Sequence, residues 1–330
     1  MSKRNILVRI DNRTRLLSAV LATTTYPEKS QERQKHGTPL HARGTRKLLA
    51  EFNHHPAVVG LQVLLDKGIP LDSIFGYACR LSWPELSGDE PPRWVPPHWN
   101  EQLKHFYEIT KLGQWWQDED ENWQATIGHL DDIFDKIDFY QFLEPFFGLI
   151  PETLVFIPNI SYPTDTNLRF RVGGELIALL PPRKAWGDSA PWPYDNDPVY
   201  MYQEVLKAYE ELLLQAALHQ NAAMVSILSE KPISISDKFT ARHPSWPEQL
   251  SSLFTAASIA IFLEQSTHPL EAKAFVQMQQ KVEDIPILPE VIRLLKRYLE
   301  DQKNGKYATF AEFLPVFGKN LRIMKTFAKL

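Results

Sequence analysis

The residues of this chain that are best spaced for chemistry are Gln215, Ala216 and His219, within the segment Leu212–His219. On a helix, side chains four residues apart lie on one face, so positions 215 and 219 can reach a common ligand. In the HExxH motif both positions are His and bind one zinc ion, and a Glu after the first His activates the zinc-bound water. Of those three groups this chain keeps only the second His, as His219. Gln215 replaces the first His and is a poor zinc ligand, and Ala216 replaces the Glu with a methyl group that cannot take a proton. The segment therefore predicts either an apolar packed helix that carries one His, which is the commoner case, or a metal site without its chemistry.

The composition favours an ordinary globular protein. The chain has 330 residues, of which 44% are hydrophobic and 23% charged, enough to bury a sizeable core. A net charge of −4 with scattered Lys and Arg argues against a nucleic-acid partner. Cys79 is the one cysteine, which excludes an intramolecular disulfide and a Cys-based zinc or iron–sulfur site and favours the cytoplasm. The start of the chain is too short of apolar residues for a secretory signal, and no apolar stretch predicts a membrane span.

The pattern of apolar residues predicts helices, then a few strands, then helices, which is typical of a mostly helical α+β fold. Strands are expected over residues 6–10, 153–157, 168–172 and 175–180, the last two as a hairpin or bulged edge strand around Gly173-Gly174. A helix is expected after a cap at Asp11-Asn12, with Leu16, Leu17, Val20 and Leu21 as its periodic apolar residues. Further helices are expected over about 46–52, 57–67, 71–81, 100–117, 121–137, 199–218, 246–265, 269–281, 289–301 and 309–317, with an aromatic-rich short segment over 140–147. We expect three segments in one compact unit: a strand and helical layer (1–83), a connection rich in Pro and Trp with further helices (84–150), and a core with C-terminal helices (151–330).

Several short segments, in order along the chain, are similar to a bacterial zincin-like metallopeptidase family, a domain of unknown function whose active members carry HExxH and a Glu on a later helix. The segments are Phe52–Val58, Gly68–Asp72, the strand pair before the long helix, Gln215–His219, Ser245-Trp246 and Lys306–Pro315. The resemblance implies a zincin-like core, with a small mixed sheet packed on the degenerate active-site helix. It places the first zinc His on Gln215, the catalytic Glu on Ala216 and the second His on His219. The third ligand would lie near Ser251 or Ser252, and neither is a usual zinc ligand.

The resemblance therefore implies a catalytically inactive pseudo-metallopeptidase with no metal and no cofactor, which binds a peptide or protein in the former substrate cleft. A zincin substrate pairs with an edge strand above the active-site helix. By position, that strand is Glu175–Leu180, and the cleft wall is the loop with Trp186 and Trp192. Two alternatives stay open. One is a zinc-dependent peptidase or hydrolase with His219 and ligands from elsewhere in the chain, and the other is a structural or regulatory helical protein.

Three other groups of residues have simpler explanations. His54-His55 before Pro56 favours helix-terminal capping or packing over a metal pair, because neighbouring side chains diverge by roughly 100° on a helix. The acidic run Asp118–Glu121 lacks the spacing of a calcium loop and suits the start of a helix. Tryptophans in and beside the proline-rich loops are either loop anchors, which we favour, or part of a partner-binding groove.

Overall fold

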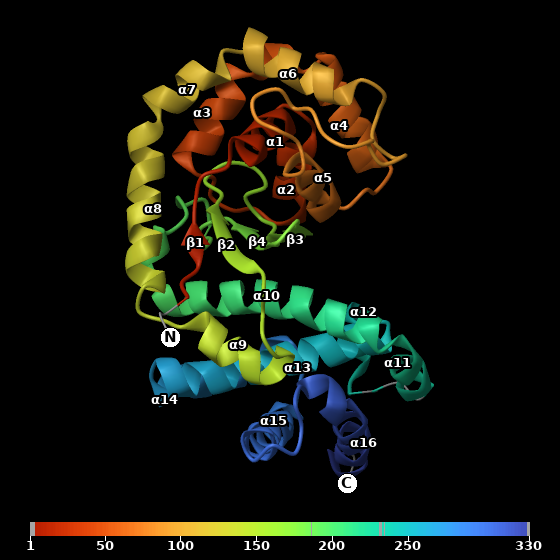
Figure 1. Ribbon diagram of the computed structural model, residues 1–330. Helices are drawn as coiled ribbons and strands as arrows, with labels where there is room; N and C mark the ends of the chain where they lie inside the picture. Colours follow the sequence, from red (N-terminus) through yellow and green to blue (C-terminus); the bar gives the residue numbers. More distant parts are fainter. Residues whose placement is uncertain (1–3, 186, 231–232, 234, 329–330) are drawn as a thin grey trace. The chain divides into compact units, whose positions relative to one another are not determined.

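The computed structural model describes residues 4–185, 187–230, 233 and 235–328, which form two compact units (Figure 1). The sheet unit comprises Ile6–Lys136 and Glu152–Met201. The helical unit comprises Met1–Asn5, Ile137–Pro151 and Tyr202–Leu330. The units cut across the expected segments because the chain leaves the sheet unit after residue 136, returns to it at residue 152, and leaves again near residue 201.

The sheet unit contains a four-stranded mixed sheet in the order β1-β2-β4-β3. The strands are β1 (Leu7–Val8), β2 (Thr153–Pro158), β3 (Leu168–Val172) and β4 (Glu175–Leu180). Parallel pairing joins β1 to β2 and β2 to β4, whereas β3 and β4 form an antiparallel hairpin. In β2 and β4 nearly every side chain is buried, as expected for parallel strands covered on both faces. The predicted hairpin is confirmed, with Gly173 at φ +56° in its turn.

Helices surround this sheet. They are α1 (Asn12–Ala22), α2 (Tyr26–Arg33), α3 (Leu40–Leu48), α4 (Pro56–Asp66), α5 (Leu71–Ala78), α6 (Trp99–Ile109), α7 (Leu112–Asp118) and α8 (Asp120–Phe134), with single 3₁₀ turns η1 (Ala50–Phe52) and η2 (Tyr194–Asn196). Asp11 caps α1 by accepting a hydrogen bond from the Arg13 amide at 3.0 Å. Helix α5 packs on β3, and its Asp72 carboxylate accepts the Arg169 amide of that strand at 2.7 Å. That contact occupies an outward amide of the edge strand and so covers part of the sheet edge.

In the described part of the helical unit, the secondary-structure elements are helices. They are α9 (Phe139–Phe147), most of α10 (Pro198–Gln220), α11 (Ala222–Ser229), α12 (Asp237–Arg242), α13 (Trp246–Ser266), α14 (Pro269–Val282), α15 (Leu288–Lys303) and α16 (Phe310–Ala328). Helix α13 starts at a capping box between Ser245 and Glu248 and is buried along most of its length. Pro145 lies inside α9, and its carbonyl accepts a hydrogen bond from the Tyr298 hydroxyl at 2.6 Å. Buried aromatic side chains around Tyr298 form much of this core.

The mostly helical α+β class predicted from the sequence is confirmed. The expected single helix over 100–117 is wrong, because Lys111 adopts a left-handed conformation (φ +54°) and separates α6 from α7. Helices α11 and α12 were not expected, and α16 continues well beyond 317. Among the residues that the structure describes, no helix has the length and apolar character to cross a membrane.

Candidate functional site

Helix α10 carries the three positions that the sequence assigns to a former metal site. Gln215 and His219 are exposed, and Ala216 is half-buried. Beside these positions, Leu214 and Leu218 are buried and pack into the core of the helical unit. No group of three or more His, Cys, Asp or Glu side chains with metal-binding geometry occurs within the described part of the chain. The helix therefore uses its core face for packing, and the motif positions lie on its outer surface.

One acid on α10 is buried. Glu210 has no exposed surface and accepts a hydrogen bond from the Ser258 hydroxyl of α13 at 2.5 Å. Burial raises the pKa of Glu210 well above its usual 4.5, and the Ser258 hydrogen bond only partly opposes that effect. Burial therefore favours the protonated form of the carboxyl group. A neutral acid inside the core is neither a general base nor a good metal ligand.

The expected cleft strand is not at a sheet edge. Strand β4 pairs with β2 on one side and β3 on the other, so a peptide cannot add to it as a further strand. Leu180 is buried, and Glu175 is bound to Arg9 through both carboxylate oxygens at 2.5 and 2.7 Å. Trp186 lies outside the described residues. Trp192, the other tryptophan of the expected wall, is 39% exposed.

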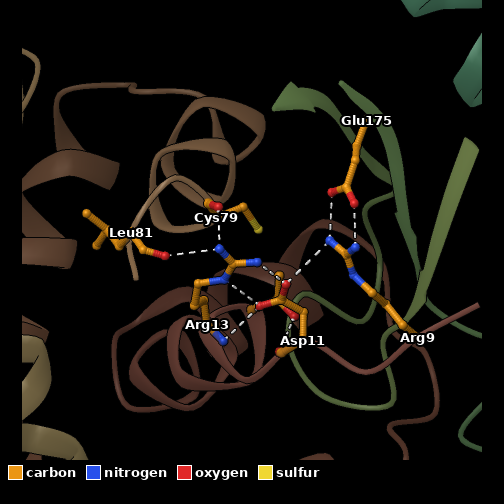
Figure 2. Close-up of polar contacts among 7 residues, drawn as sticks. Arg9, Asp11, Arg13, Cys79, Leu81 and Glu175 are labelled. Carbon is orange, nitrogen blue, oxygen red and sulfur yellow. Dashed lines mark hydrogen bonds and ion pairs between the residues drawn. The ribbon is translucent and has the colours of Figure 1, made fainter. Parts of the chain in front are cut away.

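The Arg9–Glu175 pair belongs to a larger polar network at the start of α1 (Figure 2). The Arg13 guanidinium donates to the Asp11 carboxylate at 2.9 and 2.5 Å and to the Cys79 and Leu81 carbonyls at 2.5 and 3.0 Å. It thereby satisfies carbonyl groups at the end of α5, which have no partner inside the helix. Burial acts to raise the pKa of Asp11, but Arg13 outweighs it and the pKa is lowered from 3.8.

The acidic and thiol groups of this network are poorly suited to catalysis. Its carboxylates are held by Arg side chains, and Cys79 is buried. Burial raises the pKa of the Cys79 thiol, which disfavours the nucleophilic thiolate. The network therefore joins α1, α5 and β4 as a structural link.

A second group in the sheet unit is aromatic. The Arg15 guanidinium lies between the rings of Trp116 and Trp123, 4.4 and 4.6 Å from their centres. Arg15 is 8% exposed, and its Nε and Nη2 atoms have no acceptor among the described residues. Burial lowers the pKa of Arg15 to about 10, and the charge of Asp120 opposes that change. The predicted acidic run thus begins α8 and also provides negative charge near a buried cation.

Most of the tryptophans are anchors, as we favoured from the sequence. Trp99, Trp116 and Trp123 are buried, and Trp83, Trp94 and Trp115 pack against the main core of the sheet unit. The Trp99 indole donates to the Ala57 carbonyl at 3.0 Å and fixes α6 on α4. These contacts account for the tryptophan-rich stretch by loop anchoring.

Sequence reasoning missed a buried relay near the end of β2. The Nδ1 atom of His36 lies 2.8 Å from the Gln34 carbonyl, which must accept, so Nδ1 carries the proton. Nε2 of His36 then accepts from the Thr164 hydroxyl at 2.8 Å. This order of hydroxyl, imidazole and acceptor can activate a nucleophile. Thr164 and His36 are both buried, however, and their contact spans 128 positions in sequence. The relay holds the loop after β2 against the segment between α2 and α3.

Comparison with protein families, with curated proteins and with solved structures gives no match to this chain. The similarity to zincin-like metallopeptidases therefore stays a hypothesis.

Proposed function

We propose that this protein binds a peptide or a partner protein and does not use α10 for catalysis. The observation that carries this proposal is the Trp192 surface, formed by Trp192 and Arg183 of the sheet unit. Trp192 is 39% exposed, and the Arg183 guanidinium lies 5.8 Å from the centre of its ring. Trp and Arg are the residue types that most often dominate the free energy of protein binding.

The Trp192 surface is held in place before any partner binds. The Trp192 amide donates to the Arg183 carbonyl at 2.9 Å, and Arg183 forms an ion pair with Asp197. Two residues further on, the buried Tyr194 hydroxyl donates to the Leu180 carbonyl at 2.7 Å and accepts the Asn159 amide at 3.0 Å. A preformed contact surface loses less conformational entropy on binding than a loose loop would.

This proposal replaces strand addition by side-chain recognition, because β4 has no free edge. It needs no zinc or other cofactor and no nucleic-acid or membrane partner. We place the activity in the cytoplasm, because the chain's single cysteine cannot form an intramolecular disulfide. We do not favour the alternative of a zinc hydrolase built on His219, because that side chain is exposed on the outer face of α10.

Selection of peptides on the full-length protein, followed by titration of the selected peptides, tests the proposal. We expect Trp192→Ala to weaken their binding by about 2 kcal/mol, roughly 30-fold, as loss of an aromatic anchor does. Because the Trp192 side chain is partly exposed, the melting temperature of the Trp192→Ala variant should stay close to that of the wild type. Leu270→Ala is the matched control, since Leu270 is also exposed but lies in the helical unit. Peptides that bind Trp192→Ala as tightly as the wild type would contradict the proposal.

A further inference from the structure

Two histidines of the sheet unit form a hydrogen-bonded pair between neighbouring helices. His55 precedes the first residue of α4, and His105 lies on α6. The Nε2 atom of His55 is 2.9 Å from Nδ1 of His105, and their ring centres are 5.2 Å apart. The His55 ring also packs edge-on against the buried Phe106. His55 is half-buried and held against Phe106, whereas His105 is exposed at the surface of α6.

His55 satisfies the first turn of α4. Its Nδ1 atom accepts the Ala57 amide at 3.1 Å, and its carbonyl accepts the Val58 and Val59 amides at 2.9 and 3.0 Å. Pro56 has no amide proton. The capping function expected for this position from the sequence is thus confirmed. The first three amides of α4, those of Ala57, Val58 and Val59, therefore all have His55 as their hydrogen-bond acceptor.

The cap fixes where protons can lie. Because Nδ1 of His55 accepts from Ala57, the neutral ring must carry its proton on Nε2. Nε2 then donates to His105, so Nδ1 of His105 must be bare. The chain from the Ala57 amide through His55 to His105 is complete when both rings are neutral.

A single added proton breaks this chain. A protonated pair has three N–H groups on four nitrogens, so one nitrogen stays bare. If the bare atom is Nδ1 of His55, the cap survives but two N–H groups face each other between the rings. If it is either facing nitrogen, the rings stay bonded but Nδ1 of His55 gains a proton and the Ala57 bond is lost. A metal ion shared by the two facing nitrogens would also force a proton onto Nδ1 of His55 and break the cap.

The surroundings supply no strong compensation for the added charge. Burial lowers the pKa of His55 from 6.5, and the charge of a protonated His105 lowers it further. Along α6, Glu101 and Glu108 lie about one turn from His105, and Glu101 is already paired with His98 at 3.0 Å. In the turn before α4, Glu51 and His54 are exposed.

We propose that His55 and His105 form a proton-sensitive latch, which holds the start of α4 against α6 while both rings are neutral and releases it when Nδ1 of His55 takes up a proton. The folded state favours the neutral form of His55. Its contribution to stability is therefore complete above about pH 6.5 and is lost as the pH falls through the lowered pKa. The released part is the corner formed by η1 and the first turn of α4.

Hydrogen exchange of the Ala57 amide in the full-length protein tests the latch. After correction for intrinsic exchange rates, we expect protection to fall roughly fivefold between about pH 8 and about pH 5, the effect of a lost cap. His55→Asn should keep protection at both pH values, because Asn caps a helix without titrating. His54→Ala, a neighbouring exposed histidine, should behave as the wild type.

Two outcomes would overturn the latch. One is pH-independent protection of Ala57 in the wild type. The other is stabilisation of the wild type by added zinc at about pH 8 that is absent from His55→Asn, because it would make the pair a metal site.

Discussion

Glu210 of the helical unit and Arg15 of the sheet unit are both buried ionisable residues, and the two units accommodate them in opposite ways. The helical unit buries Glu210 completely, which raises its pKa and favours its neutral form, and Ser258 donates one hydrogen bond to it. The sheet unit buries Arg15, which stays charged near neutral pH because its pKa falls only to about 10. A carboxyl group can discard its charge when it is taken from water, whereas a guanidinium group cannot. The sheet unit therefore needs two tryptophan faces and nearby acidic residues where the helical unit needs one hydroxyl group.

Two arginines of α1, Arg13 and Arg15, differ in how many hydrogen-bond partners their guanidinium groups have. The Arg13 guanidinium has partners for all of its nitrogens, and its removal would take two hydrogen bonds from the buried Asp11 carboxylate and one from each of two carbonyls. We expect Arg13→Met to lower the free energy of unfolding by about 3 kcal/mol, as loss of one partner of a buried pair does. Arg15→Met should change it by about 1 kcal/mol or less, or raise it, because Met fills the same space without a buried charge. Urea unfolding of both variants measures the difference, and equal losses would remove the distinction between the two arginines.

Glu210 gives the comparison a pH dependence. Its pKa is raised in the folded state, so its contribution to stability is complete below about pH 4.5 and is lost as the pH rises toward the folded pKa. Between those values the loss is about 1.4 kcal/mol for each pH unit. Glu210→Gln keeps the shape of the side chain but cannot titrate, so it should remove this dependence of the free energy of unfolding on pH. Unfolding curves of both proteins at about pH 5 and pH 7 measure it, and parallel pH profiles would mean that Glu210 is not the source.

The sequence predicted what depends on local patterns. The continuous apolar runs of β2 and β4, the Gly173-Gly174 turn, the cap at His55 and the long helices could all be read directly. The interior position of β4 could not, because strand order depends on which distant segments pair. The break at Lys111 was missed because a left-handed residue other than Gly leaves no mark in the periodicity.

The candidate site divides in the same way. The exposure of Gln215 and His219 was not predicted, because the HExxH spacing fixes a shared helix face but not whether that face is buried. The partners of Arg15, Glu210 and His36 come from segments far apart in sequence, which one chain read alone does not reveal. The tryptophans had the right chemistry for either role, and only their burial separates Trp123 from Trp192.

The central claim is that this protein binds a partner without a metal centre on α10. Zinc content is its most direct test, measured by plasma mass spectrometry on full-length protein produced in zinc-supplemented medium and purified without chelator. Because Gln215 and His219 lie on the outer face of α10, we predict far less than one tightly held zinc ion per chain and the same content in His219→Ala. A content near one zinc per chain that is lost in His219→Ala, together with a peptidase activity that a chelator abolishes, would contradict the account.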